Sequence, residues 1–345
     1  MTLGKPSRYD RQTRLPMIGI EGQQKLGRSQ VAILGCGALG TVAADILARA
    51  GVGRLRLIDR DVVEWTNLQR QSLYTEIDAQ QARAKADAAC EALAKANSEI
   101  QCEPIVADLN ADNIASILED CDLVIDAVDN FAVRFLLNDY SLEHHLPWVH
   151  GGCVGTGGQV AFFRGTGRPC LRCLVPEVPP ASAVATCDTA GVLGSATHMI
   201  ASLQATEAIK WLTGNEHAIR EGVWSLDFWT NRNRVVALPA TIGEDCKACG
   251  FGERSFLHGP GGGGAAVVCG RLAVQLIPAT VGMVNLDEIA SRWQTLGEVN
   301  SNRFFTRIRI SEFETLTIFR DGRALIEGTD EISRARTIYS QLIGG

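Results

Sequence analysis

A glycine-rich turn is the first feature of the sequence that could do chemistry. Residues 35–40 read GCGALG and match the pattern G-x-G-x-x-G, after the apolar residues 31–34 and before a stretch with helical spacing. Backbone N–H groups in such a turn, together with the N-terminus of the helix, attract phosphate oxygens. The glycines of the pattern, Gly35, Gly37 and Gly40, therefore predict a nucleotide site, with a simple tight turn as the alternative.

A cluster of polar residues follows the next predicted strand. Asp59 stands 19 residues after Gly40, where a carboxylate can hold ribose hydroxyls, and these two features alone fit a dinucleotide-dependent dehydrogenase. Hydride transfer has no evident need for the other polar residues of this segment, whereas ATP chemistry needs acids for ribose and Mg²⁺ and amide and guanidinium groups for phosphates. A solvated polar loop is the alternative. The other residues are Asp61, Asn67, Gln69 and Arg70.

Three more charged residues are expected near this cluster. Lys85 lies in an alanine-rich helical segment, and Asp126 and Asp129 end an apolar strand. Ligands of an open parallel sheet bind at the carboxyl ends of its strands, so we expect these side chains to converge there. For Lys85 alone, an ordinary surface position is more common.

Four cysteines form two C-x-x-C pairs, Cys170 with Cys173 and Cys246 with Cys249, separated by 72 residues. Four thiolates suit tetrahedral Zn²⁺, and no open coordination position is indicated, so we expect a structural site. Such a metal would staple the end of the domain onto its middle. A redox pair is the alternative, but thioredoxin-type motifs use one C-x-x-C at the start of a helix.

The remaining cysteines do not share this spacing. Cys187 lies in the small and polar run 182–194, where an exposed thiol could act as a nucleophile and a buried small side chain is the alternative. In the reducing cytoplasm, where we expect this protein, structural disulfides are rare. We therefore predict simple packing for the other six: Cys36, Cys90, Cys102, Cys121, Cys153 and Cys269.

The elements that must position these residues alternate between strand and helix patterns. This order predicts an α/β fold with a doubly wound, Rossmann-like and mostly parallel sheet, whose C-terminal part the zinc would hold. Strands are expected at 31–34, 54–61, near Ile105, at 121–130, 147–152 and 158–163, and helices at 41–53, 79–96 and 199–214.

A domain boundary is expected after Gly250. Residues 251–265 contain the run Gly261–Gly264 and are predicted to form a flexible linker. Residues 266–345 read as strand, helix, strand, a hairpin turning at Asp321 and Gly322, and helix. This pattern predicts a small α+β domain of unknown role behind a first domain of residues 1–250.

Composition excludes several classes of protein. The chain has 345 residues with 33 basic and 39 acidic side chains, a net charge of −6, so no nucleic-acid partner is expected. It has no apolar run of about 18 residues and no secretory signal at its start, so no membrane partner is expected either. We therefore expect a cytoplasmic protein.

The order of the motifs resembles that of the ThiF/MoeB/HesA family, the bacterial relatives of ubiquitin-activating enzymes. The likeness covers roughly residues 8–250, and residues 266–345 lack the features of the rhodanese module that some relatives carry. The motifs are RYDRQ, GCGALG, AGVG, DRDVVEWTNLQRQ, DAVDNF, GGQ, CLRC, TCDTAGVLG, LQATEAIKWLTG and CKAC.

The resemblance implies an ATP-dependent adenylyltransferase. Its substrate would be the C-terminal glycine of a small ubiquitin-like sulfur-carrier protein, ThiS-like or MoaD-like, in thiamine or molybdopterin biosynthesis. The carboxylate would attack the α-phosphate to form an acyl-adenylate, which a persulfide donor would later convert to a thiocarboxylate. A nicotinamide-dependent oxidoreductase and a scaffold without activity are the alternatives.

The resemblance also implies roles for single residues. Lys85 is preferred over Arg83 because of its 12-residue distance to Asn97. The chain ends in Gly344-Gly345, which we do not interpret as a carrier tail. The implied roles are ribose binding for Asp59, phosphate binding for Asn67, Arg70 and Lys85, Mg²⁺ binding for Asp129, contact with the nucleotide of the other subunit of a homodimer for Arg11, Zn²⁺ binding for Cys170, Cys173, Cys246 and Cys249, and sulfur or carrier transfer for Cys187.

Overall fold

The chain divides into two units, Met1–Gly259 and Pro260–Gly345. The computed structural model describes residues 7–179, 187–238, 242–259, 265–267, 272–277 and 283–343. In this part of the chain, no helix is long and apolar enough to cross a lipid bilayer.

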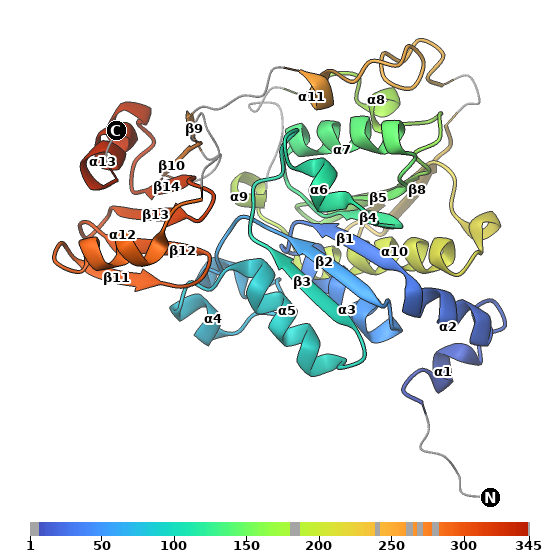
Figure 1. The fold of residues 1–345 in the computed structure, drawn as a ribbon. Coiled ribbons are helices and arrows are strands. Elements are labelled where there is room, and N and C mark those ends of the chain that lie inside the picture. The colour runs from blue at the N-terminus through green and yellow to red at the C-terminus, as the bar shows by residue number, and fades with distance from the viewer. Residues whose placement is uncertain are drawn as a thin grey trace, which may run out of the picture. The chain divides into compact units, whose positions relative to one another are not determined.

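The first unit contains an eight-stranded sheet with the order β3-β2-β1-β4-β5-β6-β7-β8 (Figure 1). The pairs from β3 to β5 are parallel and those from β5 to β8 are antiparallel. The predicted mostly parallel sheet is confirmed, and β7 and β8 are additional strands. The strands are β1 (Gln30–Leu34), β2 (Arg54–Ile58), β3 (Gln101–Ile105), β4 (Leu123–Asp126), β5 (Trp148–Val154), β6 (Gly157–Phe163), β7 (Val223–Asp227) and β8 (Arg232–Val236).

Helices cover both faces of this sheet, so the side chains of β1 are buried on both sides. Val31 and Ile33 of β1 pack with α3, α5 and α10, whereas Ala32 and Leu34 pack with α6 and α7. The helices are α1 (Asp10–Thr13), α2 (Gly19–Arg28), α3 (Gly40–Ala50), α4 (Glu76–Gln80), α5 (Lys85–Ala96), α6 (Ile114–Leu118), α7 (Phe131–His144), α8 (Leu171–Leu174), α9 (Cys187–Ala190), α10 (Gly194–Leu212) and α11 (Ser255–His258), with 3₁₀ turns η1 (Trp65–Asn67) and η3 (Glu216–Ala218).

The predicted single helix over 79–96 is wrong, because the chain forms α4 and α5 with a break between them. Ala82 adopts a φ of +45°. Within the break, Arg83 O accepts a hydrogen bond from Val63 N, and Lys85 N donates one to Asp61 O. These contacts with the segment after β2 outweigh the helix propensity of the alanines. As a result, Lys85 stands at the first turn of α5 beside Asp61.

Two of the cysteines predicted to pack separately instead form a disulfide, which corrects that prediction. Cys90 lies on α5 and Cys102 on β3, with their Cα atoms 5.3 Å apart. The pair forms because α5 packs against β3, at the edge of the sheet. Cys36 and Cys121 are free thiols, Cys153 is half-buried and packs against the core, and Cys269 lies outside the described residues.

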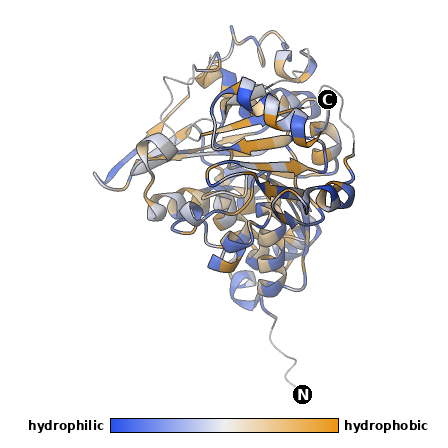
Figure 2. Cartoon of the chain, turned by 90° about the vertical axis from the view of Figure 1, so that its left-hand side faces the viewer, coloured by the Kyte–Doolittle hydropathy of each residue, from blue (hydrophilic) through white to orange (hydrophobic). Residues whose placement is uncertain are grey.

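The second unit contains an antiparallel sheet with the order β11-β12-β13-β14-β10-β9, together with α12 and α13. Its core contains Trp293 of α12, Ile318 of β13 and Ile338 of α13, and apolar residues gather on the strands in Figure 2. The hairpin at Asp321 and Gly322 forms as predicted, whereas Gly261–Gly264 lie outside the described residues. The elements are β9 (Ala265–Val267), β10 (Ala273–Leu276), α12 (Leu286–Trp293), β11 (Glu298–Ser301), β12 (Phe305–Arg309), β13 (Thr315–Phe319), β14 (Ala324–Glu327) and α13 (Ile332–Leu342).

The disulfide predicts a stability that depends on reductant. A bond that closes a loop of this length contributes about 3 kcal/mol, chiefly by restricting the unfolded chain. Dithiothreitol should therefore lower the thermal midpoint of the wild-type protein and leave that of the Cys90→Ala/Cys102→Ala variant unchanged. Cys121→Ala is the control and should respond like wild type. An equal response of the double variant would contradict the disulfide.

Candidate nucleotide site and cysteine cluster

The glycine loop lies between β1 and α3, where other backbone segments crowd it. A Cβ on Gly35, whose φ is +88°, would lie 2.7 Å from Ala127 O, and a Cβ on Gly40 would lie 1.8 Å from Gly35 O. Neither position can hold a larger residue without a shift of the loop. Gly37 is more open, because the nearest atom to its Cβ position is an amide nitrogen of Gln71 at 3.9 Å. This opening leaves room for a phosphate beside the loop amides.

Asp59 supports the glycine loop, and its role as the ribose ligand stays a prediction. Its Oδ2 accepts a hydrogen bond from Cys36 N at 2.7 Å, and its Oδ1 accepts one from Asp61 N at 2.7 Å. Burial raises the pKa of the carboxyl, and the nearby Lys85 acts in the opposite direction. Asp61 has a side chain that is 38% exposed and is the more accessible carboxylate.

Lys85 is a buried site residue, so the alternative of an ordinary surface lysine is wrong. Its side chain is 6% exposed, and its Nζ lies 3.4 Å from Asp61 Oδ2. Arg83, the other candidate on this segment, is instead paired with three carboxylates at 2.7–3.1 Å, those of Asp78, Asp87 and Glu91. Of these two candidates, Lys85 is therefore the one that lies beside Asp61.

The 3₁₀ turn after β2 and the residues just beyond it hold the amide and guanidinium groups predicted to bind phosphates. Asn67 is 2% exposed, and its Oδ1 accepts a hydrogen bond from Glu64 N at 3.1 Å. Arg70 is half-buried and donates from Nη1 to Thr66 O at 2.8 Å. Both side chains are thus oriented by contacts within their own turn.

The two aspartates after β4 have different environments. Asp126 is fully buried and bonded to Arg134 at 3.1 Å and to His150 at 2.7 Å, so the expectation that it faces a ligand is wrong. Although burial opposes ionisation, these two partners hold the pKa of Asp126 below its usual range. Asp129 is exposed, in the loop that follows the same strand.

Arg60 is a site residue that the sequence did not indicate. Its Nη1 lies 3.1 Å from Asp108 Oδ1, and its Nε lies 3.9 Å from Asp61 Oδ1. Burial alone would lower the pKa of Arg60, but the charges of Asp108, Asp61 and Asp129 raise it. Acids from the ends of three strands therefore surround one guanidinium. The only sequence signal was its position between two aspartates.

Two predicted residues remain outside this geometry. Arg11 lies on α1 with an exposed side chain, near the exposed apolar residues Leu15, Met17 and Ile20. Cys187 is the first residue of α9, but its side chain is outside the described part of the chain. The roles of Arg11 and Cys187 stay predictions.

The four C-x-x-C cysteines converge, and they could hold a metal ion. The Sγ atoms of Cys170 and Cys173 are 3.8 Å apart, those of Cys170 and Cys246 3.7 Å, and those of Cys173 and Cys249 3.3 Å. All four lie within 4.8 Å of one another. A tetrahedral Zn²⁺ with Zn–S bonds of about 2.3 Å requires sulfur separations of about 3.8 Å. The cluster therefore fits zinc.

Helix α7 supports both halves of this cysteine cluster. Leu171 N, in the first C-x-x-C, donates to Asn138 Oδ1 at 2.8 Å. Phe256 N, shortly after the second, donates to Asp139 Oδ2 at 3.0 Å. Both acceptors are buried. Two segments that are distant in sequence are thus both held by hydrogen bonds to α7.

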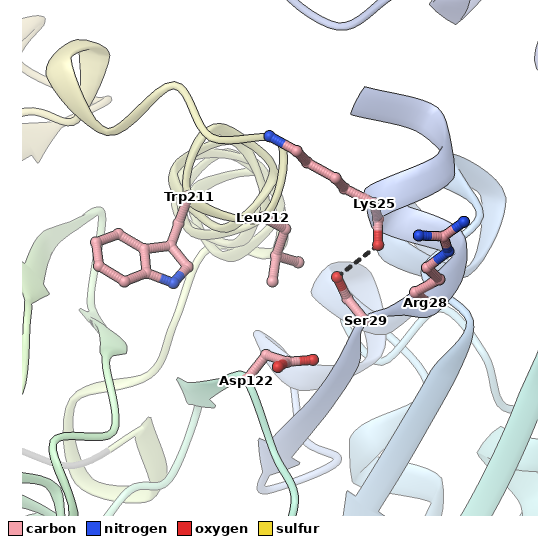
Figure 3. Close-up of a pocket in the computed structure, with 6 residues that line it drawn as sticks. All are labelled: Lys25, Arg28, Ser29, Asp122, Trp211 and Leu212. Carbon is pink, nitrogen blue, oxygen red and sulfur yellow. Dashed lines mark hydrogen bonds between the residues drawn. The ribbon is translucent and has the colours of Figure 1, made fainter. Parts of the chain in front are cut away.

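A hollow of about 310 Å³ lies away from this site (Figure 3). It is lined by Lys25, Arg28, Ser29, Asp122, Trp211 and Leu212. Ser29 precedes β1, whereas Gly35 follows it. The hollow therefore belongs to the opposite end of the sheet from the glycine loop.

Comparison with known proteins identifies the family. The chain matches the ThiF family over residues 9–248. The chain belongs to the ThiF family. It is 39% identical to the sulfur carrier protein ThiS adenylyltransferase of Bacillus subtilis, over 98% of this chain and 99% of that protein. It is 37% identical to the adenylyltransferase and sulfurtransferase MOCS3 of Danio rerio, over 70% of this chain and 52% of that protein.

Solved structures agree with this fold. The crystal structure of E. coli MccB with ATP superimposes with a TM-score of 0.61 at 23% identity, over 71% of this chain and 75% of MccB. Like these relatives, the protein is an adenylyltransferase. Enzymes of this class use ATP. The comparisons give no support to the oxidoreductase alternative.

The loop geometry predicts the effect of a single methyl group. Gly40→Ala should displace Gly35 and weaken ATP binding at least about tenfold, because the loop amides lose their arrangement around the phosphates. Gly27→Ala is the matched control, since its added methyl meets no atom within 4 Å. Isothermal titration with ATP would measure both. An unchanged affinity of Gly40→Ala would exclude the loop from the site.

Removal of metal from the cysteine cluster should affect stability before it affects nucleotide binding. A chelator should lower the thermal midpoint by about 5 °C or more, since the metal would connect distant segments. ATP affinity should change less than about twofold at temperatures where the protein stays folded. Cys249→Ala should show the lower midpoint without chelator. A chelator that leaves the wild-type midpoint unchanged would refute the staple.

Proposed function

We propose that this enzyme adenylates the C-terminal glycine carboxylate of a ThiS-like sulfur-carrier protein. The observation that carries this proposal is the extent of the match to the Bacillus subtilis ThiS adenylyltransferase. That alignment spans 338 residues and so includes the second unit, whereas the MOCS3 alignment spans 243. A protein that shares both units is the better guide to the substrate, which supports a role in thiamine rather than molybdopterin biosynthesis.

In this proposal, ATP lies over the glycine loop with its phosphates toward Lys85, Arg70 and Asn67. Asp59, which also holds the loop in shape, remains the proposed ligand of the ribose, and Asp61 is the accessible carboxylate beside it. Asp129 fits Mg²⁺, because an exposed carboxylate is the hard oxygen donor that this ion prefers. When bound, Mg²⁺ supplies positive charge at the phosphate oxygens.

The reaction joins the carrier to AMP. A carboxylate oxygen of the carrier's last glycine forms a bond to the α-phosphorus, and the bond from that phosphorus to the bridging oxygen breaks as pyrophosphate leaves. No general base is needed, because the carboxylate is already ionised at pH 7. The work of Lys85 and Arg70 is to orient the phosphates and to stabilise their charge.

Further parts of the proposal concern the assembly. The exposed Arg11, beside exposed apolar side chains, suits a homodimer in which it reaches the partner's nucleotide. We propose structural zinc at the four cysteines, later sulfur transfer from a persulfide donor with Cys187 as the loop thiol, and a cytoplasmic location. The domains remain proposed as 1–250 for ATP binding, 251–265 as linker and 266–345 for carrier docking or dimer support.

Intact-protein mass spectrometry would test the reaction. A ThiS-type carrier incubated with enzyme, ATP and Mg²⁺ should gain the mass of one AMP, and a MoaD-type carrier should gain little. Arg70→Ala should lose at least about 100-fold in rate, because charge stabilisation of the phosphates is lost. The matched control is Arg28→Ala, at the distant hollow. Transfer to the MoaD-type carrier alone would overturn the proposed partner, and no transfer to either would overturn the reaction.

A further inference from the structure

A buried polar cluster lies at the carboxyl end of β4, directly before the exposed Asp129. Its centre is Asp126, which is 0% exposed, and its other members reach it from both faces of the sheet. Arg134 comes from α7 and Gln204 from α10, and these helices pack on opposite faces (Figure 1). Burying polar groups costs free energy unless they form hydrogen bonds. The hydrogen bonds of this cluster therefore show which parts of the chain it holds in position.

The planar guanidinium of Arg134 contacts one side-chain carboxylate and two backbone carbonyl oxygens. Its Nε lies 3.1 Å from Asp126 Oδ2, while its Nη2 donates to Val128 O and to Gly151 O, the latter at 3.1 Å. The side chain is 9% exposed. Val128 directly precedes Asp129, and Gly151 lies in β5. The guanidinium thus ties the loop after β4 to the neighbouring strand.

Gln204 binds the backbone at the same end of β4 from the other face of the sheet. Its Nε2 donates to Asp126 O at 2.8 Å and to Val149 O at 3.1 Å. It is 0% exposed, and a Cβ on Gly151 would lie 2.3 Å from its amide oxygen. The side chain therefore bridges β4 and β5 at the level where the loop begins.

The remaining bonds of the cluster involve His150, whereas Gln204 Oε1 has no hydrogen-bond partner among the described residues. His150 Nδ1 donates to Asp126 Oδ2 at 2.7 Å, and Gln159 Nε2 lies 3.2 Å from His150 Nε2. Burial lowers the pKa of His150. The carboxylate of Asp126 is paired with the guanidinium of Arg134, and the bonds of the cluster fix the positions of the chain around it.

The loop itself is fixed at both ends. Ala127 N donates to Leu34 O at 2.9 Å, which ties its start to β1. Asn130 caps α7, since its Oδ1 accepts a hydrogen bond from Val133 N at 2.9 Å. Between these anchors, Arg134 holds Val128 by its carbonyl oxygen, and the side chain of Asp129 is exposed.

We propose that Arg134, assisted by Gln204, is a positioning residue that sets Asp129 at the distance and angle needed to bind the divalent cation of the nucleotide. This inference rests on the proposed function. It assigns Arg134 no contact with ATP or the carrier: Arg134 acts through the backbone of Val128. Outer partners of metal ligands commonly change metal affinity 10–100-fold, which sets the size of the expected effect.

The test is the dependence of nucleotide binding on Mg²⁺. Isothermal titration gives the dissociation constant of a non-hydrolysable ATP analogue with and without Mg²⁺, and the ratio of the two measures the coupling. Arg134→Lys keeps a charge beside Asp126 but has one nitrogen in place of the fork, so it cannot hold the carboxylate and both carbonyls. The ratio should fall about tenfold, with little change in the Mg²⁺-free constant.

Arg172→Lys is the matched control, because Arg172 is another buried arginine of the first unit and is paired with Glu253 at 3.2 Å beside the cysteine cluster. It should lose thermal stability and keep the wild-type ratio. If Arg134→Lys does not fold, Gln204→Met removes two donors from the same place and should lower the ratio in the same direction. A wild-type ratio in the Arg134→Lys or Gln204→Met variant would overturn the inference alone. Wild-type protein that binds no analogue would overturn the proposed function as well.

Discussion

The two hydrogen bonds that Asp59 accepts from the backbone are the interaction on which the nucleotide site depends. One comes from the glycine loop after β1 and the other from the segment after β2, so a single carboxylate sets the spacing of two strand ends. Once that spacing is set, Asp61 O can accept from Lys85 N and start α5 at the right residue. The main cation of the site is thus placed by backbone contacts that begin at Asp59.

Helix α7 connects the nucleotide site to the cysteine cluster of the same unit. Its first turn holds Arg134, which grips the loop of Asp129, and its middle holds Asn138 and Asp139, which anchor the two C-x-x-C segments. The cysteine cluster and the acid end of the sheet are therefore built on one rigid element. Because each anchor is a buried hydrogen bond, a shift of the helix would break several of them together.

Local patterns in the sequence were sufficient for the glycine loop, the mostly parallel sheet and the paired cysteines, since each depends on spacing within a short segment. They were insufficient where distant segments decide. The break before Lys85 arises from pairing with residues after β2, and the Cys90–Cys102 bond from the packing of α5 on β3. Asp126 resembled a ligand by position, but its partners come from α7 and β5, which no local pattern reveals.

The position of the second C-x-x-C pair has a consequence for how the chain is made. Every strand of the eight-stranded sheet precedes Cys246 in sequence. Because synthesis proceeds from the N-terminus, the sheet and α7 can form before the last two thiols leave the ribosome. Closing the cluster is then the final step, and it captures a segment that a nascent chain would otherwise leave loose. The cluster of four sulfurs can therefore form only after nearly the whole first unit has been synthesised.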